Sequence, residues 1–260
     1  KQSCLPTGVL KIIKEISKMA SYIFDLETDG LLEQATKIHS LVLKDIESGK
    51  IYSYADHSDF RPISAGLGRL SRSDTVIGFN SIRFDLPVIG KLYPEYDQKL
   101  LESGLGHLDL LVCSRLIWTD MFERDMKQGK VPKELRGKHS LKSWGYRLDV
   151  LKGDFPDTSD FSEWSPEMQS YCERDVEITF LLWKLVQSKK YSIQALRLEQ
   201  MFADLIFQQE LNGFGFDEKA AGELYGLLVK DRECLRERLI KDVPPTEVKM
   251  KSIDHWIDEK

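Results

Sequence analysis

Two acidic residues lie close together near the start of the chain, in a stretch that otherwise predicts a buried strand. Residues 22–30, YIFDLETDG, open with bulky apolar side chains and close on Thr-Asp-Gly, which is a turn signal. Asp25 and Glu27 are separated by one residue, so a strand projects both from the same face. Burying two acids on one face is costly unless a positive charge compensates them, and a divalent cation held by oxygen ligands does this most simply. Taken alone, such a pair is usually a solvated strand edge.

The composition of the chain limits the class of protein and the cellular location that we expect for it. Its 260 residues suffice for one sizeable domain and a smaller appendage, and 42% hydrophobic residues are typical of a globular protein. The net charge of −5 does not favour a nucleic-acid binder, although an acidic metal site can mask a local basic patch. The four cysteines show no C-x-x-C spacing, which predicts neither a zinc site nor disulfides and favours a reducing, cytoplasmic location. No apolar run has the length that a membrane span needs, so we expect no membrane partner.

The pattern along the chain predicts a mixed α/β layer fold with a helical tail. Residues 1–18 precede Met19-Ala20, and we interpret them as a leader or vector-derived extension, with a short amphipathic turn as the alternative. After the first strand, further strands are expected at 37–46, 51–55 and 75–79. Helices are expected at 63–70, through 92, from 165 to 186, at 192–211 and at 217–240. Residues 107–118 are expected to be an apolar segment that leads into a helix.

Three acidic elements together suggest a chemistry that none of them suggests alone. Asp25 and Glu27 share a strand face, and Asp85 closes an N-x-x-x-F-D frame where a strand passes into a helix. Tyr171 and Asp175 are four residues apart, so they share one face of the helix that begins at Ser-Pro-Glu. Four carboxylates can balance two divalent cations, and two ions about 4 Å apart can activate water and stabilise the leaving oxygen of a phosphodiester. The alternative for Tyr171 is a core aromatic.

The order D-x-E, N-x-x-x-F-D and Y-x-x-x-D resembles the exonuclease motifs of the DEDD superfamily of 3′→5′ exonucleases. Tyr171 is similar to the tyrosine subgroup, because the histidine subgroup would have His where this chain has Ser170. Stretches without a catalytic role also resemble the family A replicative DNA polymerases of podophages. These stretches are SRLI at 114–117, HSLKSWGYRL at 139–148 and QELNGFGFD at 209–217. The resemblance covers roughly residues 19–240.

This resemblance implies a proofreading 3′→5′ exonuclease domain at 19–190, on a ribonuclease H-like mixed sheet flanked by helices. It implies a C-terminal helical extension at 191–260 that leads toward a polymerase thumb. Two Mg²⁺ or Mn²⁺ ions would be held by Asp25, Glu27, Asp85 and Asp175. Tyr171 would orient the attacking water, since a phenol with a pKa near 10 is a poor base at neutral pH. The implied substrate is a single-stranded or frayed DNA 3′ end, and the implied location is the host cell cytoplasm.

The chain departs from the polymerases in its length. It stops at residue 260 and has no palm, fingers or thioredoxin-binding loop. We therefore expect either a shortened polymerase or one piece of a split polymerase, whose polymerase region belongs to the same or a companion chain. We expect no DNA synthesis from this chain alone.

Contacts to DNA are expected from the corner before Asp85 and from a basic run at 124–142, which is interpreted as a loop that contacts the phosphate backbone. The candidate residues are Asn80, Phe84, Lys133, Arg136, Lys138 and His139. A solvated loop is the alternative for the basic run, and a structural role is the alternative for His139.

Two other functions remain open at this stage. An RNA-trimming exonuclease similar to ribonuclease D would use the same catalytic motifs, because metal chemistry on a phosphodiester does not depend on the sugar. A catalytically inactive nucleic-acid-binding module would have acids that do not converge in space.

Overall fold

The computed structural model describes residues 21–96, 106–150 and 161–243, and the expected leader at 1–18 lies outside these ranges. The chain divides into two compact units, one ending at Leu211 and one beginning at Asn212. The strands of the described part are β1 (Ser21–Thr28), β2 (Ile38–Asp45), β3 (Ile51–Tyr54), β4 (Thr75–Gly78) and β5 (Gly106–Asp109). The helices there are α2 (Ile63–Leu70), α3 (Asp85–Leu92), α5 (Leu110–Ile117), α6 (Met121–Gln128), the 3₁₀ helix η1 (Lys133–Leu135), α7 (Leu141–Arg147), α8 (Pro166–Ser188), α9 (Ile193–Asn212) and α10 (Glu218–Asp242).

The acid-bearing strand β1 is the central strand of a five-stranded mixed sheet of order β3-β2-β1-β4-β5. It pairs antiparallel with β2, which places Asp25 opposite Val42, and parallel with β4. Parallel β4 is reached by a crossover through α2, as the geometry of parallel strands requires. The mixed α/β architecture predicted from the sequence is confirmed.

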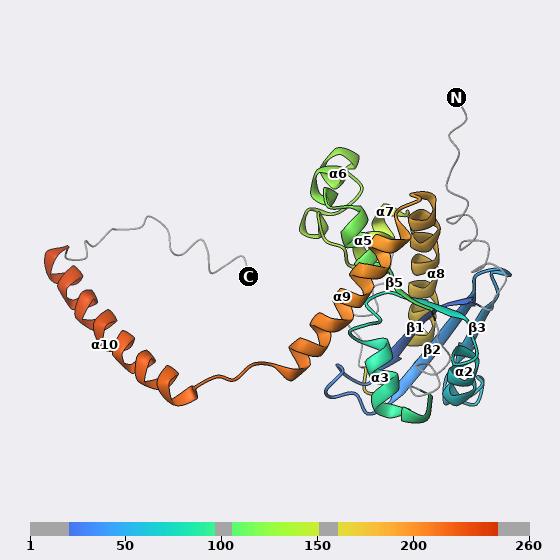
Figure 1. Cartoon of the computed structure of the whole chain (residues 1–260), viewed down its shortest axis with the longest axis horizontal. Coiled ribbons are helices and arrows are strands. Elements are labelled where there is room, and N and C mark those ends of the chain that lie inside the picture. Colours follow the sequence, from blue (N-terminus) through green and yellow to red (C-terminus); the bar gives the residue numbers. More distant parts are fainter. Residues whose placement is uncertain (1–20, 97–105, 151–160, 244–260) are drawn as a thin grey trace, which may run out of the picture. The chain divides into compact units, whose positions relative to one another are not determined.

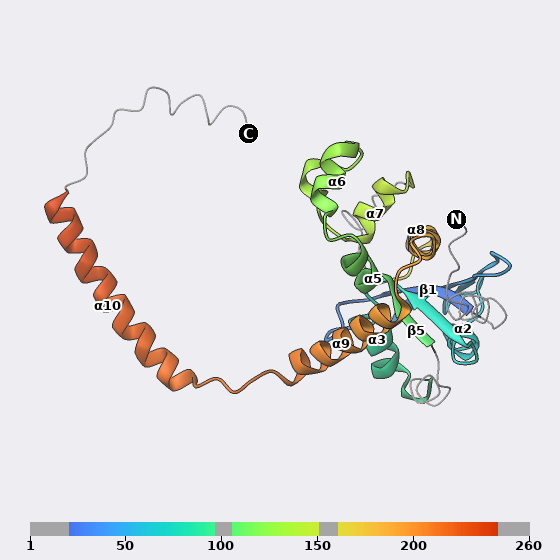
Figure 2. The same ribbon diagram turned by 45° about the horizontal axis from the view of Figure 1, so that its top comes forward.

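Helices cover both faces of this sheet, and each face has its own core (Figures 1 and 2). Alternation along β1 sends Tyr22, Phe24 and Leu26 into the core shared with α2 and α3. The other face, which carries Ile23, Asp25 and Glu27, is the one against which α8 packs, with α5 and α7 beside it. The two acids therefore lie between the central strand and the longest helix of this unit.

Helix α8 is positioned by a strong start signal and by a continuous buried stripe. The Ser165 Oγ accepts a hydrogen bond from the Met168 N–H at 3.1 Å, and Pro166 occupies the first helical position. Its buried residues recur every three or four positions. This stripe consists of Met168, Tyr171, Cys172, Asp175, Val176, Thr179, Leu182, Trp183 and Val186, and Gln169, Ile178 and Phe180 are buried beside it. The helix predicted for 165–186 is confirmed.

Two segments differ from their sequence-based expectations. The apolar stretch 107–118 opens with an edge strand, β5, which is only four residues long and runs directly into α5. The basic run 124–142, expected as a loop, instead includes most of α6, η1 and the start of α7. Helix α6 buries Met121 and Asp125 on one side and ends where Gly129 adopts a left-handed φ of 68°. Apart from Asp125, the charged residues of α6 lie on its solvent side. Few apolar residues are left in this run, so the sequence does not reveal the helical period.

The first compact unit includes nearly all of α9 and so extends beyond residue 190, where we expected the exonuclease domain to end. The division of the chain into catalytic and non-catalytic domains stays a prediction. In the second unit, α10 begins at an Asp217 side chain that accepts a hydrogen bond from the Ala220 N–H at 2.9 Å. Among the described helices, none combines the length and apolar character that crossing a membrane requires.

Candidate metal and nucleic-acid site

Asp25 and Glu27 converge with a third possible ligand that the sequence analysis did not single out. One carboxylate oxygen of each acid and the Sγ of Cys172 lie within 4.8 Å of one another. The Cys172 thiol contacts the Asp25 carbonyl at 3.4 Å and the Asp25 Oδ2 at 3.6 Å. Burial, followed by the charges of the neighbouring acids, raises the pKa of Cys172 well above its usual range. The group therefore stays a neutral thiol, which packs beneath the acids.

Helix α8 brings Tyr171 and Asp175 to the same place. Both side chains are buried, and they lie one turn apart on the face that packs against β1. Burial raises the pKa of the Tyr171 phenol, and the charges of Asp175, Glu27 and Asp25 raise it further. Tyr171 therefore keeps its proton at neutral pH. Its hydroxyl can donate or accept a hydrogen bond, but it does not act as a base.

Asp85 completes the acidic group from the first turn of α3. Its side chain is 4% exposed. Burial raises its pKa to about 7, and the charges of Asp109 and Asp175 act in the same direction. Four acids from β1, α3 and α8 thus share one region, as their order in the sequence predicted.

Asp109 is a fifth acid at this site, almost fully buried, that the sequence analysis missed. Its carboxylate accepts hydrogen bonds from the N–H groups of Asn80 (2.9 Å), Ile82 (3.2 Å) and Leu111 (2.8 Å). Asn80 needs this support because its φ of 61° is in the left-handed region. Asp109 therefore fixes the corner from which α3 presents Asp85. The sequence signal that could have identified Asp109 is the segment GHLD, in which polar and apolar residues alternate and which leads directly into a helix.

A cleft of about 730 Å³ opens beside this acidic group, and two of the acids, Asp25 and Asp175, line it. Its lining residues are Asp25, Phe79, Asn80, Leu111, Arg115, Gly137, Lys138, His139, Ser140, Leu141 and Asp175. Three of the expected DNA contacts, Asn80, Lys138 and His139, are among them. Arg115, which the sequence analysis did not propose, adds a second positive side chain.

The other three expected DNA contacts do not line this cleft. Phe84 packs partly buried against the core between the sheet and α3. The Arg136 side chain donates to the Val131 carbonyl at 3.2 Å, and Lys133 is exposed on η1. A role for these three in DNA binding stays a prediction.

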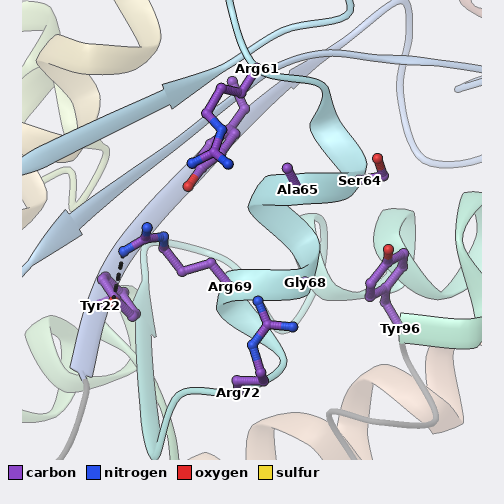
Figure 3. Close-up of a pocket in the computed structure, with 9 residues that line it drawn as sticks. Tyr22, Arg61, Ser64, Ala65, Gly68, Arg69, Arg72 and Tyr96 are labelled. Atoms are coloured by element: carbon purple, nitrogen blue, oxygen red, sulfur yellow. Dashed lines mark hydrogen bonds between the residues drawn. The ribbon is translucent and has the colours of Figure 1, made fainter.

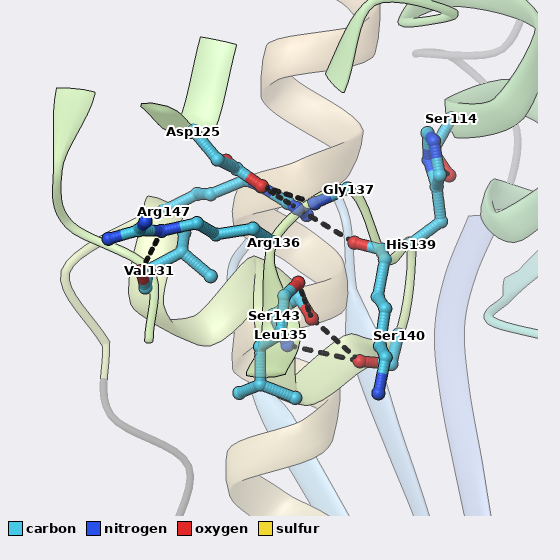
Figure 4. Close-up of polar contacts among 11 residues, drawn as sticks. Ser114, Asp125, Val131, Leu135, Arg136, Gly137, His139, Ser140, Ser143 and Arg147 are labelled. Carbon is cyan, nitrogen blue, oxygen red and sulfur yellow. Dashed lines mark hydrogen bonds and ion pairs between the residues drawn. The ribbon is translucent and has the colours of Figure 1, made fainter. Parts of the chain in front are cut away.

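The segment that carries Lys138 and His139 is held by a buried ion pair (Figure 4). Arg147 of α7 donates to both carboxylate oxygens of Asp125, at 2.9 and 2.7 Å. The same carboxylate accepts from the Gly137 N–H at 2.9 Å, while Arg147 donates to the Lys138 carbonyl at 2.7 Å. Both side chains are almost fully buried. This bidentate arrangement fixes the backbone of 137–138 at the rim of the cleft.

His139 has both a structural contact and a place in the cleft. Its Nδ1 lies 3.0 Å from the Ser114 Oγ, and its ring meets the Trp144 ring edge to face at 6.5 Å. Burial lowers its pKa, and the positive charges of Arg147 and Arg115 lower it further. His139 is therefore neutral at pH 7, so any contact it makes to a phosphate is a neutral hydrogen bond.

The residues present fit divalent cations. Carboxylate oxygens are the ligands that Mg²⁺ and Mn²⁺ prefer, and four of these side chains converge here from separate elements. Burial raises the pKa of Asp85, and the neighbouring acids Asp109 and Asp175 raise it further, so its charged form is disfavoured unless a positive charge compensates it. A divalent metal site is therefore consistent with the chemistry and the charge of this cleft.

Comparisons with known proteins agree with this geometry. A family model described as RNase_H superfamily matches residues 22–187, from β1 almost to the end of α8. The DNA-directed DNA polymerases of Enterobacteria phage T3 and Escherichia phage T7 are each 31% identical to this chain, over 255 and 261 residues. Each match covers 84% of this chain and 36% of the polymerase, so the chain spans little more than a third of these relatives.

A solved structure described as the apo form of a nuclease aligns with a TM-score of 0.48 at 16% identity, covering 79% of this chain and 92% of that one. The family match includes all four acids and Tyr171, and its ribonuclease H-like fold is the one predicted from the motifs. The chain therefore belongs to the RNase H superfamily.

Proposed function

We propose that this chain is a metal-dependent 3′→5′ exonuclease that removes nucleotides from single-stranded or frayed DNA ends. The observation that carries the proposal is the convergence of Asp25, Glu27, Asp85 and Asp175, together with Tyr171, beside a cleft with a positive rim. A merely structural acid cluster would not need an open cleft, and a passive DNA-binding module would not need buried acids.

The four acids would hold two Mg²⁺ or Mn²⁺ ions. Bound there, such ions supply an activated water and stabilise the charge that develops on the leaving oxygen. The protein contributes rigidity, because β1, α3 and α8 each carry acids into the site from a regular element. Preformed ligands avoid the cost of ordering them when the substrate binds.

Tyr171 would orient the attacking water with its hydroxyl. Burial raises the pKa of its phenol, which favours a positioning role over general-base catalysis. At the rim, Lys138 and Arg115 would contact phosphates, and Asn80 would contact the terminal nucleotide.

DNA is the preferred substrate because the relatives that match most of this chain are named DNA polymerases. By the same reasoning, the chain would act beside a polymerase region, on the same or a companion chain, in the cytoplasm of a phage-infected cell. The role would be proofreading, in which a frayed 3′ end enters the cleft.

The test is cleavage of oligonucleotides that carry a label at the 5′ end or the 3′ end. With Mg²⁺, we expect 5′-labelled single-stranded DNA to shorten one nucleotide at a time, and EDTA or the Asp175→Ala variant to stop it. Blunt duplexes should be cut more slowly, since unpairing the terminal bases costs a few kcal/mol. Products that shorten from the 5′ end would contradict the proposal, and a strong preference for RNA would favour the ribonuclease D-like alternative.

A further inference from the structure

A second polar pocket lies on the opposite face of the sheet from the acids. It has a volume of about 470 Å³ and is formed around α2 (Figure 3). Its lining residues are Tyr22, Tyr54, Arg61, Ser64, Ala65, Gly68, Arg69, Arg72 and Tyr96. Tyr22 lies three positions before Asp25 on β1, so alternation sends the two side chains to opposite faces. This pocket is therefore separate from the acidic cleft.

The charge of this pocket is unusual for this protein. Three arginines line it and no acid does, although the whole chain has a net charge of −5. None of these three guanidinium groups forms an ion pair with a carboxylate in the part of the chain that the structure describes. Three like charges around one pocket repel one another, and an anion bound among them would relieve that repulsion.

The Arg69 side chain is held in place by contacts that leave donors available. The Arg69 guanidinium lies 3.9 Å from the centroid of the Tyr52 ring, and it donates to the Tyr22 hydroxyl at 3.4 Å. The Arg61 backbone is tied to the end of β3, since its carbonyl accepts from the Ala55 N–H at 3.1 Å. Arginines that are ordered before binding lose less entropy when they bind an anion.

Gly68 of α2 lines the pocket next to Arg72 and Tyr96. A Cβ at this position would lie 3.7 and 3.8 Å from the two terminal nitrogens of Arg72, and 3.8 Å from a ring carbon of Tyr96. The absence of a side chain leaves room between a guanidinium and an aromatic ring. The pocket thus combines donors for a phosphate with aromatic surface on which a base can stack.

We propose that this pocket binds the phosphate group of a nucleotide, either as a free nucleotide or as part of a single strand. Arginine provides paired donors in the geometry that phosphate oxygens accept, and three arginines match a group with two or more negative charges. The volume is within the range of small-ligand sites. This proposal does not depend on the exonuclease activity, because it concerns other residues and needs no metal.

The test is calorimetric titration of the full chain in EDTA, which prevents metal-dependent cleavage. The probes are pyrophosphate, thymidine 5′-monophosphate, thymidine and an eight-residue oligothymidylate. The test variant is Arg61→Gln with Arg72→Gln, since both side chains are exposed at the rim. The matched control is Lys189→Gln with Arg197→Gln, which removes two exposed positive charges that line neither pocket. Melting curves check that each variant is folded.

We expect pyrophosphate and the monophosphate to bind the wild type and the control equally, and the test variant roughly ten- to a hundredfold more weakly. Thymidine, which lacks a phosphate, should not bind. A parallel loss for the oligonucleotide would assign the pocket to a strand, and a loss confined to the small probes would assign it to a free nucleotide. The proposal is overturned if the wild type binds neither small phosphate probe, if thymidine binds as well as its monophosphate, or if the test variant matches the control.

Discussion

Asp85 lies in the first turn of α3 with little access to water, and this burial disfavours its charged form. Its pKa in the folded protein is raised to about 7 from an ordinary value of 3.8. Between these values the unfolded chain releases the proton while the folded protein keeps it. The unfolded state then binds fewer protons, so the metal-free protein loses stability as pH rises through this window and levels off above it.

We therefore expect Asp85→Asn to remove part of this pH dependence. In EDTA, the wild type should have a lower free energy of unfolding at pH 8 than at pH 5. This decrease should be smaller in the variant, by on the order of 2 kcal/mol. Denaturant unfolding at the two pH values measures the difference. Asp109 is also buried and has a raised pKa, so Asp109→Asn serves as a companion variant. An identical pH dependence in the wild type and Asp85→Asn would show that Asp85 is already ionised when the site lacks metal.

Tyr171 supplies a single hydroxyl whose loss can be separated from loss of metal binding. Tyr171→Phe keeps the buried ring, so we expect folding and metal binding to persist while the rate falls by roughly 10²-fold or less. Asp25→Ala and Asp175→Ala should instead lose almost all activity, since they remove ligands. Single-turnover rates and calorimetric titration with Mn²⁺ distinguish the two effects. Loss of Mn²⁺ binding in Tyr171→Phe would make the hydroxyl a ligand.

At the scale of elements, the segment between α6 and α7 presents a positive side chain at the rim of the cleft. Lys138 lines the cleft, whereas Lys133 is exposed on η1 outside it. We expect Lys138→Ala to raise KM about three- to tenfold and to reduce the slope of log KM against log salt by about 0.7, the value for one lost contact to single-stranded DNA. Lys133→Ala is the matched control. Equal effects of the two substitutions would mean that the segment acts only through its overall charge.

The Asp125–Arg147 ion pair should act on the same contact through the backbone. Arg147→Lys keeps the charge but cannot bridge Asp125 and the Lys138 carbonyl in the same planar geometry. We expect KM to rise while kcat stays within about twofold, because the acids on β1 and α8 are unaffected. Steady-state kinetics on single-stranded DNA measure both. A fall in kcat with unchanged KM would show that this ion pair supports the catalytic acids instead.

The sequence predicts some elements of this fold well and others poorly, for physical reasons. Helix α8 was predictable because its start signal and its buried stripe are both local. The D-x-E and Y-x-x-x-D spacings are local in the same way, since each places two side chains on one face of its element. Strand β5 was not, because four residues are too few to establish a period of two before a helix begins. The role of Asp109 depends on the distant Asn80 and Ile82, and the arginine pocket depends on a β1 residue facing α2. Such pairings follow from the assembled sheet and from no local pattern.

At the scale of the whole chain, α9 belongs to the same compact unit as the site. The Gln200 side chain exchanges hydrogen bonds with the backbone of Asp109, at 2.9 and 3.0 Å, and Phe207 of α9 is buried. Arg83, beside the catalytic corner, pairs with Glu210 at 2.8 Å. These contacts connect α9 to the corner that positions Asp85.

Truncation should therefore separate two possible ends of the catalytic unit. We expect a chain that ends at residue 212 to keep its Tm and its nuclease activity. A chain that ends at residue 190 should lose ~5–10 °C in Tm, since it loses the buried Phe207 and the partner of Asp109. Thermal melting and cleavage of single-stranded DNA test both chains. Equal Tm values would place the end of the stable unit before α9.

The distribution of the acids along the chain also has a consequence for how the protein is made. Asp25 and Glu27 are on the first described strand, and Asp175, on α8, follows Asp25 by 150 residues in the sequence. Contacts between residues so distant in sequence form late in folding, because a long loop must first close. During translation, the cleft cannot assemble until α8 has emerged from the ribosome. A nascent chain therefore carries no competent nuclease site until α8 has been synthesised and has emerged.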